Sequence, residues 1–270
     1  MIWNMGILLT NGDSFTYGDE LRGSRSPDGI DTHHHHTFTY KLASMIDRKY
    51  ANLGKNGSSN CKIYRRTIDH LMTDPREVDL VVITWSSMGR YEICEMDQKA
   101  GDASFHIDYE NNMNQIIPSQ KTLSLLYNFG PHPDENQFRH NTIKEYVENV
   151  LTVQTQIFKT LTYMKHIQWI CDTKGIPVIQ GIVHPANYHS IMHTLKLDGW
   201  SDYKSFVIDT LSYLRPECKI GFGYYSTIYE QVIDEKEILP MGHVNEDCHT
   251  RYADVLLDVI KEKGLLDVIN

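Results

Sequence analysis

The chain has 270 residues, of which 41% are hydrophobic and 23% charged, and its net charge is −9. This composition is that of a globular protein, and the acidic balance argues against a nucleic-acid partner, which would need a basic face. The length suits one large α/β domain.

The spacing of the cysteines and the shortness of the first apolar run bear on the cellular location of the protein. The five cysteines are widely spaced and include no Cys-x-x-Cys pair, so neither a zinc ribbon nor a disulfide framework is indicated. The first apolar run stops at Thr10 and is shorter than a signal peptide or a membrane span, which needs about 20 apolar residues. We therefore expect reduced thiols, a cytoplasmic location and no membrane partner.

Four apolar runs predict strands. Residues 4–10 are a short run that Asn11 and Gly12 end, and residues 50–54 form a second brief run. The segment 78–85 is continuous and β-branched, which is typical of a strand covered on both faces. A fourth strand is expected at 176–183, and a weaker signal marks another near 220–224.

Apolar residues at helical spacing predict the helices between these strands. One is expected at 40–50, and a long one begins at the capping box of Thr142 and Glu145 and ends before Gly175. A further helix is expected near 202–214. The last begins after its N-cap, Asn245, and its inward face is the stripe Tyr252, Leu256, Val259 and Ile260.

Strands that alternate with helices predict a three-layer α/β/α sandwich with a flavodoxin-like parallel sheet, formed by a single domain over residues 1–270. The polar segment at about 95–140 is interpreted as a lid-like insertion. In such sheets, ligands bind at the carboxyl ends of the strands. Ser14, Gly57 and Ser86 each follow a predicted strand, so we expect them at one edge of the sheet.

Three blocks of sequence carry a family resemblance. "NGDSFTYG" (11–18) resembles the Gly-Asp-Ser block of the SGNH, or GDSL, hydrolases, which are esterases and lipases. "NLGKNGSS" (52–59) is similar to the family's second block, and "GHVNEDCHTRYADVL" (242–256) to its last. The resemblance implies a serine esterase with Ser14 as nucleophile and His243 as general base. It also implies that the backbone N–H groups of Ser14 and Gly57 stabilise the oxyanion.

The sequence departs from the family at two positions. Ser86 stands where the family has an oxyanion-donating Asn, so Ser86 is a candidate donor, and Asn60 is another. Pro240 stands where the family has the Asp that orients the histidine. The groups considered as replacements for that Asp are Asp234, Glu235, Glu237 and a backbone carbonyl.

The resemblance implies a small-molecule or carbohydrate ester as substrate, and a short acyl group is favoured. One alternative is a catalytically silent module that binds a glycan or another ligand on the same fold, and another is an acyltransferase using the same residues. We expect no cofactor and no metal. The histidine run within 32–37 is interpreted as a solvated loop, because adjacent histidines in a loop cannot all face one ion. The oligomeric state is not predicted.

Overall fold

The computed structural model describes residues 6–21, 33–73, 78–88, 90–93, 103–107, 116–118, 153–196, 199 and 201–269. Four parallel strands form its central sheet in the order β2-β1-β3-β7. They are β1 (Ile7–Asn11), β2 (Lys49–Asn52), β3 (Val78–Trp85) and β7 (Val178–Ile182). This is the flavodoxin-like order, in which β1 is central and its carboxyl end lies at the point where the winding reverses.

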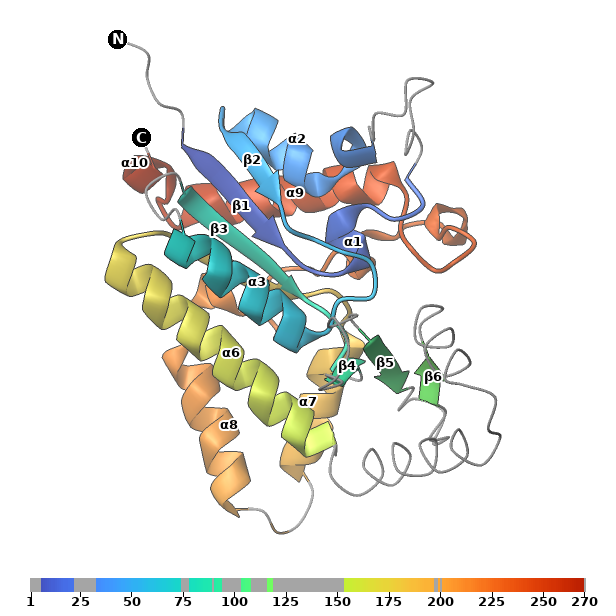
Figure 1. Ribbon diagram of the computed structural model, residues 1–270, viewed down its shortest axis with the longest axis vertical. Coiled ribbons are helices and arrows are strands. Elements are labelled where there is room, and N and C mark those ends of the chain that lie inside the picture. The colour runs from blue at the N-terminus through green and yellow to red at the C-terminus, as the bar shows by residue number, and fades with distance from the viewer. Residues whose placement is uncertain are drawn as a thin grey trace, which may run out of the picture.

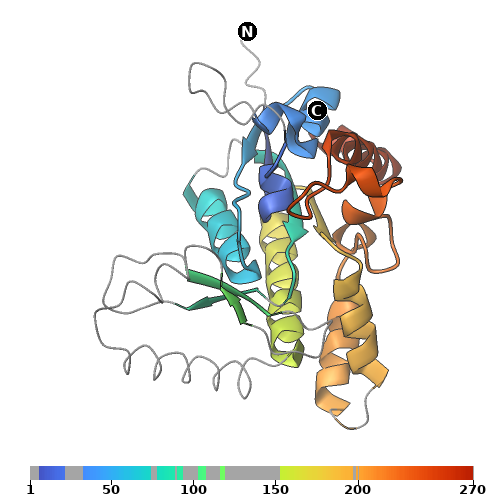
Figure 2. The same cartoon turned by 90° about the vertical axis from the view of Figure 1, so that its right-hand side faces the viewer.

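Helices cover both faces of the sheet, as Figure 1 shows. One face carries α2 (Phe38–Met45) and α9 (Glu246–Glu262), and the other carries α3 (Asn60–Thr73) and α6 (Val153–Lys174). In Figure 2, α6 lies between α3 and α8 (Ser201–Tyr213). The remaining helices are α1 (Ser14–Tyr17), α7 (Ala186–Lys196) and α10 (Leu266–Ile269). The predicted three-layer α/β/α sandwich is confirmed.

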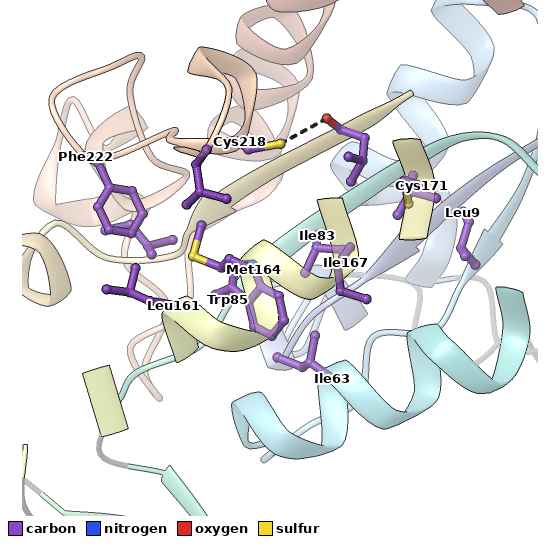
Figure 3. Packing of buried hydrophobic residues seen from close by; sticks show 14 of the residues in the cluster. Leu9, Ile63, Ile83, Trp85, Leu161, Met164, Ile167, Cys171, Cys218 and Phe222 are labelled. Carbon is purple, nitrogen blue, oxygen red and sulfur yellow. Dashed lines mark hydrogen bonds between the residues drawn. The ribbon is translucent and has the colours of Figure 1, made fainter. Parts of the chain in front are cut away.

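The side chains of the strands point alternately to the two faces of the sheet, and the hydrophobic core accordingly has two halves. Leu8, Leu80 and Val82 face α2 and α9, whereas Leu9, Val81 and Ile83 face α3 and α6. Figure 3 shows the second half, where Trp85 and Ile83 pack against Met164 and Ile167 of α6. Successive side chains of a strand point to opposite faces of the sheet. Because helices cover both faces of β3, nearly all of its side chains are buried, and its sequence at 78–85 is a largely apolar run.

Two helix ends follow their predicted signals. The Asn245 side chain accepts a hydrogen bond from the N–H of Cys248 at 3.1 Å and caps α9. Gly175 has φ = +70°, and the N–H of Ile176 bonds back to Cys171 at 2.9 Å, which ends α6 in a left-handed turn. The stripe expected on α9 is buried, with no member more than 1% exposed. The capping box of Thr142 and Glu145 lies outside the described residues.

Within and beside the expected insertion lies a small antiparallel sheet that the sequence analysis did not predict. Its order is β4-β5-β6, formed by β4 (Arg90–Ile93), β5 (Ala103–Ile107) and β6 (Ile116–Pro118). The other residues of 95–140 lie outside the described part of the chain. The lid-like role of this segment stays a prediction.

The strand expected near 220–224 is wrong. Ile220 makes a single parallel bridge to Gly181 beside β7, and the chain then turns away. Gly221 and Gly223, both at φ = +83°, take the left-handed conformation that a strand does not contain. A short 3₁₀ turn, η3 (Pro216–Cys218), precedes this segment, and two more, η4 (Tyr229–Gln231) and η5 (Glu235–Glu237), follow it.

The described cysteines form no disulfide with one another; they are Cys61, Cys171, Cys218 and Cys248. Among the helices in the described ranges, none has the length and apolar character that a membrane crossing requires.

Candidate active site

The turn between β1 and α1 places Ser14 at the carboxyl edge of the sheet. Gly12 fits because a Cβ there would lie 2.0 Å from Thr16 Oγ1 and 2.3 Å from Thr84 Oγ1. Asp13 caps α1 by accepting a hydrogen bond from the N–H of Phe15 at 3.1 Å. Ser14 is the first residue of α1 and is 1% exposed.

The loop after β2 lies against this turn. The N–H of Leu53 donates to Thr10 at 2.8 Å, and that of Lys55 donates to Gly12 at 3.3 Å. A Cβ on Gly54 would lie 2.7 Å from the backbone nitrogen of Tyr17, so only glycine allows this approach. Gly57, at φ = +71°, lies two residues beyond Lys55. The structure thus brings the Ser14 turn and the Gly57 loop together at one edge.

Two backbone donors at this edge have no acceptor among the described residues. In the ranges that the structure describes, neither the N–H of Ser14 nor that of Gly57 donates to a protein acceptor. An oxyanion site requires donors of this kind, because a group already engaged would have to break a hydrogen bond before it could act.

His243 reaches the same edge from the carboxyl-terminal half of the chain. It lies in a tight turn in which the N–H of Leu239 donates to the carbonyl of His243 at 2.7 Å, and Gly242 takes φ = +87°. The imidazole packs on Phe15, with ring centroids 5.1 Å apart. Because Phe15 follows Ser14 directly, this contact brings the predicted base beside the predicted nucleophile's helix.

The imidazole is held by Glu20. Nδ1 of His243 lies 2.8 Å from Oε2 of Glu20, and the same carboxylate accepts hydrogen bonds from the N–H groups of Met241 at 3.0 Å and His243 at 3.4 Å. Burial raises the pKa of Glu20, but the hydrogen bonds from the His243 ring and from these two N–H groups outweigh it and hold the pKa below its usual value. Glu20 is therefore a carboxylate at neutral pH.

A second carboxylate faces the other nitrogen of the ring. Nε2 of His243 lies 4.0 Å from Oδ2 of Asp19, which accepts a hydrogen bond from the Asn56 side chain at 2.5 Å. Within the described residues, the Ser14 hydroxyl makes no hydrogen bond to His243 or to any other group. The ring is adjacent to the serine helix but is not engaged with the serine itself.

The two side chains considered as oxyanion donors are both occupied. Ser86 Oγ donates to Oδ2 of Asp13 at 2.6 Å and is fully buried. The amide of Asn60 donates to the carbonyl of Ser86 at 3.2 Å and to Thr160 Oγ1 at 3.0 Å, while its oxygen accepts from the N–H of Ser86 at 2.8 Å. Since a hydroxyl has one proton, Ser86 would have to release Asp13 before it could donate to an oxyanion.

Two of the three acids considered as partners of His243, Asp234 and Glu237, have other partners. Asp234 accepts from the N–H of Lys236 at 3.0 Å. Glu237 accepts from the N–H of Ile233 at 2.8 Å and from Arg251 at 2.7 Å, and these two contacts lower its pKa to about 2. The residue that holds the imidazole is Glu20, which the sequence analysis missed. Its signal was the acidic pair Asp19-Glu20 directly after the serine helix.

The histidine run is more ordered than expected. His33–His36 form a 3₁₀ turn, His35 is exposed and stacks on Tyr40, and His36 bonds to Glu246 at 2.7 Å. No cluster of three or more histidine, cysteine or acidic residues suited to a metal ion occurs in the described ranges.

The protein is thus a doubly wound α/β sandwich, with a candidate serine–histidine site at the carboxyl edge of its sheet. No protein-family model and no curated protein matches the sequence. Several solved structures match it in fold. A carbohydrate esterase family 2 enzyme with a carbohydrate-binding domain, from Corynascus thermopiles, shares 11% identity at a TM-score of 0.48, over 95% of this chain and 66% of that one.

Two further matches extend over nearly the whole of both chains. The psychrotrophic esterase EstA from Pseudoalteromonas sp. has 11% identity and a TM-score of 0.46, over 96% of this chain and 98% of its own. A member of the lipolytic protein G-D-S-L family from Veillonella parvula has 14% identity and a TM-score of 0.44, over 95% and 98%. The Veillonella parvula protein bears the name of the G-D-S-L family, and a likeness of this size concerns the fold alone.

Proposed function

We propose that the protein hydrolyses the ester of a small molecule or a carbohydrate through an acyl-enzyme on Ser14, with His243 as general base. The observation that carries the proposal is the meeting of three separate loops at one sheet edge. A hydrogen bond from Lys55 to Gly12 joins the loop after β2 to the turn of Ser14. The ring contact between Phe15 and His243 joins the His243 turn to them. A nucleophile, a base and oxyanion donors are the parts that acyl transfer requires.

The reaction proceeds in two halves. As Ser14 Oγ attacks the ester carbon, its proton passes to Nε2 of His243, and the carbonyl oxygen becomes an oxyanion near the N–H groups of Ser14 and Gly57. The intermediate expels the alcohol, which takes the proton from His243 and leaves the acyl group on Ser14. Water then attacks the acyl-enzyme and gives its proton to His243. The carboxylic acid departs, and the proton returns to Ser14.

The proposal requires a movement of the base or of the nucleophile. Nε2 now faces Asp19 at 4.0 Å rather than Ser14 Oγ, so the hydrogen bond between base and nucleophile has to form when substrate binds. Catalytic hydrogen bonds are often long or misaligned in a free enzyme and tighten in the complex. The polar groups around the ring, Asp19 and Asn56, favour a small polar ester.

Labelling with a fluorophosphonate probe tests the proposal. We expect the wild-type protein to be labelled, and Ser14→Ala and His243→Ala to remain unlabelled although folded. The matched control is Ser44→Ala, since Ser44 is an exposed helical serine whose hydroxyl donates to the carbonyl of Tyr40 at 2.9 Å. Labelling that persists in Ser14→Ala, or a folded wild-type protein that is never labelled, would overturn the proposal.

One observation favours a second candidate, a catalytically silent module that binds a glycan or another ligand. The Ser14 hydroxyl is not bonded to His243, and the Ser86 hydroxyl is bonded to Asp13. A silent module would bind sugar acetates without consuming them and would show equal affinity in Ser14→Ala. Release of acetate by the wild-type protein alone excludes this candidate.

A further inference from the structure

We propose that Glu20 is the positioning residue of His243 and replaces the aspartate that the family resemblance leads one to expect at position 240. The inference rests on the proposed function and deepens it, because it supplies the acidic member of the catalytic set. Pro240 is exposed and has no side-chain oxygen, so the acid has to come from elsewhere. Glu20 provides it from the amino-terminal end of the chain.

The hydrogen bonds of Glu20 bind both the ring and the loop that carries it. Oε2 lies 2.8 Å from Nδ1 of the imidazole, and the N–H groups of Met241 and His243 donate to the same carboxylate. Because Glu20 binds both the ring of His243 and the backbone N–H of His243, it fixes the position of the ring as well as its orientation. Orientation of this kind is the task of the acid in a serine triad.

The contact also selects the tautomer of His243. A carboxylate only accepts hydrogen bonds, so Nδ1 has to carry the proton that it donates to Glu20. In the neutral ring, Nε2 then keeps its lone pair and can take the proton of Ser14. Asp19 lies 4.0 Å from Nε2, beyond hydrogen-bond distance, and so leaves that lone pair available.

The backbone of Glu20 gives an independent indication. Glu20 has φ = +66°, a left-handed conformation that a glutamate rarely takes. Glu20 lies in the turn that follows α1. Gly18 ends this helix after one turn, and its N–H donates to the carbonyl of Ser14 at 2.9 Å. Strained residues persist where the surrounding structure fixes them, and they cluster at functional sites. Here the conformation turns the carboxylate toward the loop of His243.

Labelling kinetics and imidazole NMR together test the inference. We expect Glu20→Gln to slow fluorophosphonate labelling of Ser14 by about 10²–10⁴-fold, because an amide can stabilise the wrong tautomer. The matched control is Glu262→Gln, which makes the same chemical change at an exposed acid in the last turn of α9 and should label at the wild-type rate. Glu20→Asp keeps the charge with a shorter reach and should fall between the two.

The NMR arm reads the resting protein and does not depend on catalysis. Nitrogen-15 spectra of the imidazole, assigned by comparison with His243→Ala, should show protonated Nδ1 in the wild-type protein and a loss of that state in Glu20→Gln. Wild-type His243 protonated only on Nε2 would overturn the inference. A thermal unfolding curve for each variant shows whether it is folded at the temperature of the assay.

The two proposals fail in different ways. Wild-type labelling that Ser14→Ala abolishes but Glu20→Gln leaves unchanged would overturn the role of Glu20 and leave the esterase standing. A folded wild-type protein that is not labelled would overturn the esterase, and the NMR spectra would still decide whether Glu20 positions the ring.

Discussion

Ser86 Oγ donates a 2.6 Å hydrogen bond to Oδ2 of Asp13, so the residue that stands in place of the family's asparagine is bonded to the aspartate of the Gly-Asp-Ser block. Both side chains are buried, at 0% and 1% exposure. The bond ties the end of β3 to the turn that presents Ser14. A residue predicted to be an oxyanion donor thus supports the nucleophile's turn in the free protein.

Substituting Ser86 with alanine separates these two roles. If the hydroxyl serves Asp13, Ser86→Ala should lower the free energy of unfolding by about 1–3 kcal/mol, because the buried Asp13 loses a donor. Turnover by the folded variant should then change by less than about tenfold. Removing a true oxyanion donor lowers turnover by about 10²–10³. Urea unfolding and initial rates on one preparation measure both quantities, and a loss of that size would assign Ser86 to the oxyanion site.

The left-handed backbone at Glu20 makes a prediction about stability. Glu20→Ala and Glu20→Gly both lack the carboxylate and differ only in the Cβ at φ = +66°. The glycine variant should be more stable than the alanine variant by roughly 1 kcal/mol, because only glycine takes this conformation without strain. Urea unfolding of the two proteins measures the difference.

A matched pair at Asp254 provides the control. Asp254 is exposed in the middle of α9, where alanine should be more stable than glycine by about 1 kcal/mol, the reverse of the order at position 20. Equal stability of Glu20→Ala and Glu20→Gly would show that the backbone there is not strained.

Buried His249 predicts a loss of stability in acid. Burial lowers the pKa of His249 to about 3, and Nδ1 accepts a hydrogen bond from the N–H of Phe38 at 3.2 Å. Because the pKa is lower in the folded than in the unfolded state, the unfolded chain binds more protons below pH 6.5. The stabilising contribution is complete above pH 6.5 and is lost as the pH falls toward 3.

His249→Asn tests this linkage, because the amide oxygen can replace Nδ1 as the acceptor and does not titrate. The variant should be less stable than wild type at neutral pH, since the packing of the ring on Phe38 is lost. Its urea midpoint should depend less on pH between 6.5 and 3. The control is His193→Asn, at an exposed position, whose urea midpoint should depend on pH as that of the wild-type protein does. The prediction would be contradicted if the urea midpoint of His249→Asn fell with decreasing pH as steeply as that of the wild-type protein.

The sheet and the last helix could be predicted from the sequence because their signals are local. The β-branched run at 78–85 coincides with β3, and Asn245 caps α9 as its position before two acidic residues indicates. These features depend on neighbouring residues and on burial of a periodic face. The small antiparallel sheet gave no comparable periodic signal.

The polar partnerships of the site could not be predicted in this way. Glu20 and His243 are 223 positions apart, and their contact depends on the early end of α1 at Gly18 and on the left-handed turn at Glu20. Motif spacing directed attention to acids just before the histidine, such as Glu237, which instead binds Arg251. The hydrogen bonds of Ser86 and Asn60 likewise join segments that only the folded chain brings together.

The same separation bears on biosynthesis. The Ser14 turn and Glu20 leave the ribosome well before His243 and α9, because 223 positions separate Glu20 from His243. Until α9 docks beside α2, the Glu20 carboxylate has neither the imidazole nor the N–H groups of the His243 turn to bind. A nascent chain therefore carries the serine turn without its base, and the site can assemble only after His243 and α9 have emerged.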